Sequence, residues 1–275
     1  MPAHLVALAA TLASQCMTGE VDAPPSVPYA FAAELGSGVY DFGGRTLQVY
    51  RLPISWSLRS AESRDNGPRV VGWRLRMPVT AGFLNFRTED ILQGQLPSSI
   101  DMLSVAPGVE WEFLPRAGWS VRPYVEAGLI FASGSHVDSI NTNAGVQADY
   151  TWNPRVGEMR WSTRFSYSRV NYQSCQTDDD MSHLRTGIDW PAAYSFNIGN
   201  RPADIGPFAM GEWFMDRPGN DKLGAAIPRF TLETGLMLQL RPMPSIWGFT
   251  APRLGLSYRF AGEFSGFRFV IGETL

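Results

Sequence analysis

The sequence predicts an all-β fold, a closed antiparallel transmembrane β-barrel of about twelve strands. Three observations predict it: apolar and polar residues alternate along most of the chain, the alternating runs are long, and long connections mostly exchange with short ones. Alternate side chains of a strand point to opposite faces, so each run has one apolar and one polar face. No helical period competes with this pattern after residue 25.

Residues 50–59, YRLPISWSLR, show the pattern clearly. Tyr50 and Trp56 belong to the apolar face, whereas Arg51 and Arg59 belong to the polar face. Similar runs follow one another to the end of the chain. They predict strands near residues 31–42, 46–59, 70–84, 101–114, 118–132, 145–153, 157–171, 183–197, 204–215, 227–241, 250–260 and 265–275.

The lengths of these runs fit a membrane. A strand of about 12 residues that rises ~3.4 Å per residue and is tilted by ~40° spans roughly 30 Å, close to the hydrocarbon thickness of a bilayer. Within a bilayer, strands find partners for all their backbone groups only in a closed barrel. We therefore expect the apolar faces to meet lipid and the faces rich in Arg, Ser, Glu and Gly to line a lumen. A soluble β-rich fold is the alternative, because it also alternates.

The connections indicate the orientation of the barrel. Outer-membrane barrels have short periplasmic turns and longer outer loops. Long polar links are expected here to exchange with tight ones such as 115–118 and 153–157. An even number of strands then puts both chain ends on the periplasmic side. The long links are 85–100, 133–144, 172–182 and 216–226.

Several prolines fall inside predicted strands. Each removes a donor from the backbone ladder, so we interpret them as bulges or strand beginnings. They are Pro53, Pro78, Pro107, Pro123, Pro191 and Pro207.

The composition limits the partners. The 23 basic and 26 acidic residues give a net charge of −3, and without a strongly basic surface no nucleic acid is expected as a partner. Lys222 is the only lysine, and arginine, which forms forked hydrogen bonds to carboxylates, suits enclosed charges. A biased base composition of the source genome is the alternative explanation. The two cysteines, Cys16 and Cys175, define no disulfide framework.

Residues 1–23 are predicted to be a signal peptide, and residues 24–275 to be the barrel. The apolar run from Leu5 to Ala13 has the length of a secretory core and is too short to span a membrane. Cleavage is expected after Ala23. The predicted location of the barrel is the bacterial outer membrane.

The closing stretch, LGLSYRFAGEFSGFRFVIGETL, resembles the last hairpin of outer-membrane barrels, with Phe267, Phe269 and Ile271 on one face. Together with the chain length and the 50–59 arm, it resembles the solitary outer-membrane autotransporter-like β-barrel proteins from about residue 30 to residue 275. The resemblance implies a stand-alone barrel of translocator type without a secreted passenger. It also implies outer-membrane lipid and lipopolysaccharide as surroundings, and the barrel-assembly machinery as a partner of the C-terminal strand.

The polar faces gather charges in the expected lumen. Paired charges that fill a small barrel and hold its strands are the structural interpretation, which the mixture of acids and bases favours. The alternative is a narrow pore for small solutes, with a charged lining that selects anions. The basic members are Arg51, Arg74, Arg76, Arg122, Arg160, Arg164, Arg185 and Arg259. The acidic members are Glu110, Glu126, Asp189, Glu212 and Glu233.

The sequence does not predict an enzyme, a cofactor or a metal. The alternative is a barrel enzyme that hydrolyses lipid A or phospholipid at the outer surface through His136 and Ser139. In the His-x-Ser pair of lipid A deacylases a serine would stand where this chain has Asp138. Asp178–Asp180, beside Cys175, could bind a divalent cation, since such ions prefer carboxylate oxygens, but such a run is usually a solvated loop.

Overall fold

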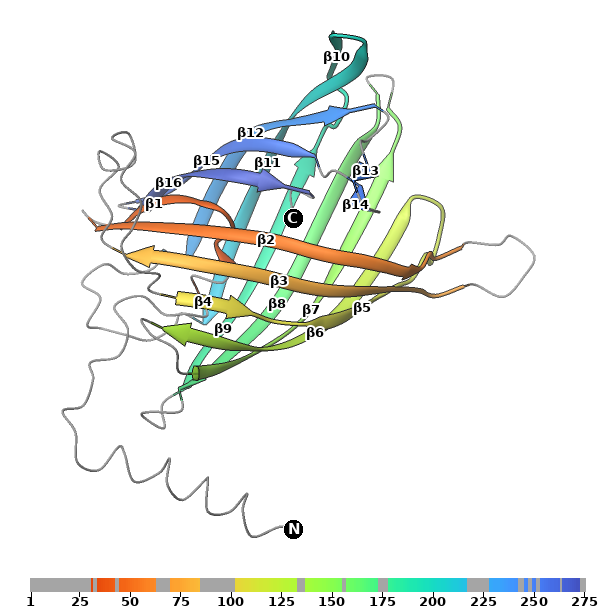
Figure 1. The fold of residues 1–275 in the computed structure, drawn as a ribbon. Coiled ribbons are helices and arrows are strands. Elements are labelled where there is room, and N and C mark those ends of the chain that lie inside the picture. Colours follow the sequence, from red (N-terminus) through yellow and green to blue (C-terminus); the bar gives the residue numbers. More distant parts are fainter. Residues whose placement is uncertain are drawn as a thin grey trace, which may run out of the picture.

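The computed structural model describes most of the chain, and nearly all of the described residues form β-strands (Figure 1). It describes residues 31, 34–42, 45–62, 70–84, 102–132, 137–154, 157–172, 178–216, 228–241, 245–246, 249–250, 253–262 and 264–272. Within these ranges, no helix has the length and the apolar character that crossing a bilayer requires. The strands are β1 (Gly38–Phe42), β2 (Arg45–Arg59), β3 (Gly72–Leu84), β4 (Met102–Val105), β5 (Gly108–Glu112), β6 (Trp119–Ala132), β7 (Val137–Trp152), β8 (Met159–Tyr172), β9 (Asp178–Asp189), β10 (Tyr194–Ile198), β11 (Arg201–Asp216), β12 (Phe230–Leu240), β13 (Ser245–Ile246), β14 (Phe249–Thr250), β15 (Leu254–Ala261) and β16 (Phe264–Ile271).

The strands form one closed antiparallel barrel, which confirms the predicted architecture. β16 pairs with β1, so the last strand meets the first. β4 and β5 share one position between β3 and β6, and β9 and β10 share one position beside β11. Counted in this way, the barrel has 12 strands. β13 and β14 form a separate two-stranded ladder.

Two strands begin much earlier than the sequence predicts. β7 begins at Val137 rather than at residue 145, and β9 begins at Asp178 rather than at residue 183. The expectation of long connections at 133–144 and 172–182 is therefore wrong. The added part of β7 pairs on both sides, with Asn143 opposite Glu126 of β6 and opposite Ser168 of β8. Polar partners across the lumen face allow this Asn-rich stretch to form a strand despite its low strand propensity.

Prolines inside strands lie where a neighbouring strand is interrupted. Pro78 stands opposite Pro53 in the β2–β3 ladder, and its carbonyl accepts from the N–H of Ala106 (3.2 Å), in the gap between β4 and β5. The carbonyl of Pro207 accepts from the N–H of Trp190 (3.0 Å), at the gap between β9 and β10. Because the facing strand is absent there, the missing N–H of proline breaks little pairing. The interpretation as bulges or strand beginnings is thus wrong for Pro53 and Pro78.

The two faces of the wall have opposite character. Leu236 of β12 is 52% exposed on the outer face, whereas Glu233 of the same strand is 2% exposed on the inner face. On β2, Tyr50 and Leu52 are more than half exposed, whereas Val49, which points to the opposite face, is fully buried. Apolar side chains therefore cover the outside of the barrel, and its inside holds most of the buried charge.

The segment before β1 lies inside the barrel instead of extending the wall. A strand over 31–42 was expected, but β1 begins only at Gly38. Gly36 has a φ of 79°, and a Cβ there would stand 2.7 Å from Nε of Arg268, so the turn at this position requires glycine. The hydroxyl of Tyr40 donates to the carbonyl oxygen of Leu35 (2.7 Å) and holds the turned segment against the wall.

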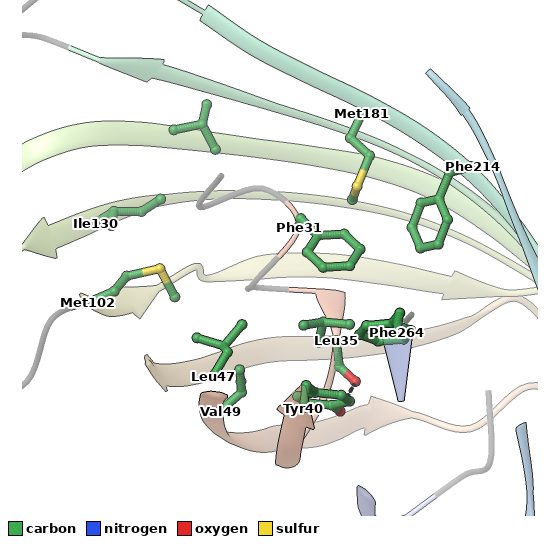
Figure 2. Close-up of a cluster of buried hydrophobic side chains, with 11 residues drawn as sticks. Phe31, Leu35, Tyr40, Leu47, Val49, Met102, Ile130, Met181, Phe214 and Phe264 are labelled. Carbon is green, nitrogen blue, oxygen red and sulfur yellow. Dashed lines mark hydrogen bonds between the residues drawn. The ribbon is translucent and has the colours of Figure 1, made fainter. Parts of the chain in front are cut away.

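Phe31 and Leu35 of this segment pack into an apolar cluster within one end of the barrel (Figure 2). The ring of Phe31 lies 5.5 Å from that of Phe214 and 6.4 Å from that of Phe264, measured between ring centroids. This cluster fills the end at which β1 turns into β2. Its members are Phe31, Leu35, Tyr40, Leu47, Val49, Met102, Ile130, Val170, Met181, Phe214 and Phe264.

Candidate functional site

The candidate site is the buried charge network on the inner face, and its centre is a chain of alternating acids and bases. Arg259 of β15 contacts Glu212 (2.7 Å) and Glu233 (2.8 Å). Glu212 also contacts Arg185 (2.6 Å), and Glu233 also contacts Arg268 (2.9 Å). These five residues form what we call the central chain. They lie on β9, β11, β12, β15 and β16, so the central chain crosses the wall from strand to strand.

The central chain is buried, so its charged groups depend on one another for partners. Arg259 is 1% exposed and makes ion pairs with both acids beside it. Removing charges from water is costly, and their attraction offsets the cost only if every group keeps its partners. The Oγ of Ser257 adds a hydrogen bond to Glu233 (2.6 Å). The arrangement therefore ties neighbouring strands together and specifies their register.

A second group surrounds Tyr124 of β6. Arg76 lies with its guanidinium carbon 4.2 Å from the centre of the Tyr124 ring, and Arg164 lies at 4.8 Å. Nη2 of Arg164 also donates to the Tyr124 hydroxyl (2.7 Å). Arg76 contacts Glu110 (2.9 Å) and Glu126 (2.8 Å). The aromatic ring therefore holds two arginines by cation–π contact while carboxylates balance one of them.

Further pairs lie toward the other end of the lumen. Arg74 contacts Glu110 (2.9 Å), and Arg122 contacts Asp149 (2.6 Å). Both Nη atoms of Arg253 contact Asp189, with Nη2 at 2.9 Å from Oδ1. In the ladder, Arg160 of β8 stands opposite Asp189 and is half-buried.

Glu34 brings a carboxylate into the network from the segment before β1. Its Oε1 accepts from Nδ2 of Asn143 (2.8 Å), and its Oε2 lies 3.6 Å from Nη1 of Arg51. Nη2 of Arg185 donates to the backbone carbonyl of Glu34 (3.3 Å). His183 lies close by, with Nε2 at 3.9 Å from Oε2 of Glu34 and 3.6 Å from Oε1 of Glu212. The N-terminal segment is thus joined to the wall through charge as well as through apolar packing.

Of the two residues of the alternative hydrolase site, the structure describes only Ser139, and it does not face the outer surface. Ser139, expected in a loop, lies in β7 with its side chain fully buried. His183, the other histidine of the barrel sequence, lies in β9 and is fully buried. His136 lies outside the described residues.

The acidic run at Asp178–Asp180 belongs to strand β9 rather than to a loop. Asp178 and Asp180 both form ion pairs with Arg169, and Asp180 also accepts from the hydroxyl of Tyr167 (3.0 Å). Cys175 lies outside the described residues. In the part of the chain that the structure describes, no group of three or more His, Cys, Asp or Glu side chains could hold a metal ion.

Sequence reasoning missed several members of the network. Arg268 and Asp149 stand at alternating positions within FSGFRFVI and ADYTW, so strict counting along these strands could have found them. No role was predicted for Tyr124, although it lies two residues after Arg122 and therefore on the same face of the strand. Glu34 and Asn143 gave no such signal, because the turn of the chain into the lumen and the early start of β7 were not predicted.

The comparisons with known proteins identify no family for this chain. No family model matches the chain, and no curated protein matches it. A similar solved structure is that of the NanC porin in a rhombohedral crystal form, with 10% sequence identity and a TM-score of 0.41. The match covers 86% of this chain and 97% of that chain.

Proposed function

We propose that the protein is an integral β-barrel of the bacterial outer membrane with a structural role. The observation that carries the proposal is the inverted distribution of side chains. Arg259 is almost fully buried inside, whereas Leu236 and Phe269 are more than half exposed outside. In a soluble protein such an extensive apolar surface would be unusual, and arginine is fully buried only where it is paired, as Arg259 is here. Lipid outside the barrel accounts for both observations.

Aromatic side chains support the same proposal, because they are enriched where membranes meet water. Trp119 contacts Tyr150 (4.9 Å between centroids) and Trp161 (6.0 Å), near the ends of their strands. Phe83 and Trp73 lie near opposite ends of β3. At ~3.4 Å per residue and a tilt of ~40°, they are roughly 26 Å apart along the membrane normal, about the height of the apolar band of an outer-membrane barrel.

The contents of the lumen favour a structural role over free passage of solutes. The central chain, Tyr124 and the segment with Phe31 and Leu35 are buried, and Arg185 of the central chain donates to the Glu34 carbonyl of that segment (3.3 Å). A narrow pore for small solutes is the second form of the proposal, and the surplus of arginines on the wall supports it. Planar-bilayer recording separates the two. We expect almost no conductance from the purified protein. A steady conductance whose ion selectivity reverses in Arg74→Glu or Arg164→Glu would favour the pore.

We also propose that the barrel is of the autotransporter-like type and that its C-terminal strand is recognised by the assembly machinery. The 50–59 arm and the closing hairpin of β15 and β16 support this proposal. The location is tested by fractionation and by gel migration of unboiled and boiled samples. A folded outer-membrane barrel is expected in the outer-membrane fraction, with different migration before and after boiling. Recovery in the soluble fraction with identical migration would contradict the proposal.

A further inference from the structure

We infer that the barrel wall holds a carboxylate-binding site in which Glu34 of the chain's own N-terminal segment is the resident ligand. Without the Glu34 side chain, the same site would take the carboxylate of a small organic anion. This inference goes beyond the proposed role, because it concerns the chemistry of the lumen and does not depend on lipid or on conduction.

The donors of this site belong to the wall and not to the segment that they hold. Asn143 lies on β7, Arg51 on β2, and His183 and Arg185 on β9. Asn143 donates to one carboxylate oxygen of Glu34 (2.8 Å), while Arg51 (3.6 Å) and His183 (3.9 Å) approach the other. Ladder pairing fixes these strands, with β7 beside β8 and β8 beside β9. The donor set therefore stays in place when the Glu34 side chain is changed.

The fit between Glu34 and this site is incomplete, which leaves room for another carboxylate. Within the described residues, Oε2 of Glu34 and both ring nitrogens of His183 have no hydrogen-bond partner, although all of them are buried. Buried polar atoms are normally paired. A free carboxylate is not restrained by the backbone, so one of its oxygens can approach the His183 ring more closely than Oε2 of Glu34 does (3.9 Å) and accept from a ring N–H.

The charges around the site also favour an anion. Glu34 is the acid that pairs with Arg51, and the other acids near the site, Glu212 and Glu126, already contact Arg185 and Arg76. Loss of the Glu34 carboxylate would remove one negative charge from a largely buried site in which Asn143 and the guanidinium group of Arg185 remain. Hydrogen bonds from charged donors to carboxylates are among the strongest in proteins. The empty site would therefore bind a carboxylate in preference to a neutral molecule.

The site is separable from the apolar packing of the segment. Phe31 and Leu35 anchor the segment in the apolar cluster, and the hydroxyl of Tyr40 holds the Leu35 carbonyl. These contacts do not involve the Glu34 side chain. A variant at Glu34 can therefore keep the segment in the lumen while it vacates the carboxylate site.

The test is chemical rescue of Glu34→Ala in the full chain, refolded in detergent. The refolded fraction and its unfolding midpoint are measured by gel migration before and after heating, in sodium acetate, sodium chloride and sodium sulfate of equal ionic strength. Ligand binding to the folded state alone stabilises it in proportion to the logarithm of ligand concentration above Kd. We expect Glu34→Ala to refold at least about threefold better in acetate than in chloride, with a saturating dose dependence.

Two controls make the rescue specific. Glu112→Ala removes another inward-facing carboxylate, which accepts from Ser120 (3.2 Å) on β6, and it should not respond to acetate. Glu34→Gln keeps the size of the side chain and fills the site with an amide, so it should refold without a response to acetate. If Glu34→Ala refolds equally poorly in all three salts, or if Glu112→Ala responds to acetate as strongly, the inference is wrong. An equal response to acetate, chloride and sulfate would also contradict it, because the site would not distinguish a carboxylate.

Discussion

The outer and inner faces of the wall are built from the same strands and yet follow opposite rules. On the outer face of β12, Leu232 and Leu236 are exposed beside other apolar side chains, with Phe260 and Leu256 opposite them on β15. On the inner face of the same strand, Glu233 is bound by Arg259, Arg268 and Ser257. The difference indicates that neither face of this strand is adapted to water. In the proposed membrane location, lipid tails would cover the apolar outer face, whereas the polar groups of the inner face must find their partners within the protein.

The largest loss of stability is expected when a buried ion pair of the inner face is removed. Arg259→Ala leaves Glu212 and Glu233 buried with one partner fewer each. Removal of one member of a buried ion pair costs ~3–5 kcal/mol. We expect the urea midpoint of the refolded barrel in detergent to fall accordingly. Double substitution of Arg259 and Glu233 by apolar residues should cost less than the sum of the two single changes, because it removes both charges. Additive losses would indicate that the two residues act independently.

The next largest loss of stability is expected when a charge is placed on the apolar outer face. Leu236→Arg places a charge near the middle of the expected apolar band, where it costs ~2–4 kcal/mol in lipid, while Leu58→Arg, at the end of β2, should cost only ~0–1 kcal/mol. Both leucines are exposed, at 52% and 63%. Reversible unfolding in lipid bilayers measures the difference. Equal and small effects of the two substitutions would mean that the outer face meets water.

A smaller effect is expected from one hydroxyl on the inner face. Tyr124→Phe keeps the ring beneath Arg76 and Arg164 but removes the hydroxyl that accepts from Arg164 (2.7 Å) and contacts Ser166 (2.9 Å). A buried charged donor without its partner costs ~1–3 kcal/mol. The unfolding midpoint should fall by less than in Arg259→Ala. Tyr150→Phe, at the outer aromatic surface, is the matched control and should leave the midpoint unchanged.

The smallest loss of stability is expected when an exposed ion pair near the end of the barrel is removed. Arg169 pairs with Asp178 and Asp180 near the ends of β8 and β9, and its side chain is exposed. Exposed ion pairs contribute little, because water and salt screen them. Arg169→Ala should therefore unfold at the same urea concentration as the unmodified protein, at low and at high salt. A loss comparable to that of Arg259→Ala would show that burial does not distinguish the two networks.

The sequence predicted the barrel because a barrel wall is a repeated local pattern. The alternation at 50–59 and at 230–240 records the two environments directly, since each side chain reports the face on which it lies. Prediction of the two early strand starts failed because the segments before residues 145 and 183 carry Asn and Asp, which are typical of turns. Their strand form depends on pairing with neighbouring strands, where Asn143 lies opposite Glu126 and Asp180 lies opposite Arg169.

The candidate site was only partly predictable for the same reason. Arg185, Glu212, Glu233 and Arg259 were found from their alternation, since each lies on the polar face of a regular strand. The place of Glu34 depends on the chain leaving the wall at Gly36, a single turn without a repeated pattern. The choice of partners within the network depends on the strand order around the closed barrel, which alternation alone does not specify.

The central claim is that lipid covers the outer face while the charged face is enclosed. Tryptophan fluorescence of the protein in bilayers tests it most directly, because Trp56, Trp73 and Trp213 are exposed on the outer face. Lipids with brominated acyl chains should quench most of the emission, and aqueous iodide should quench little of it. Strong quenching by iodide without quenching by the brominated lipids would contradict the account.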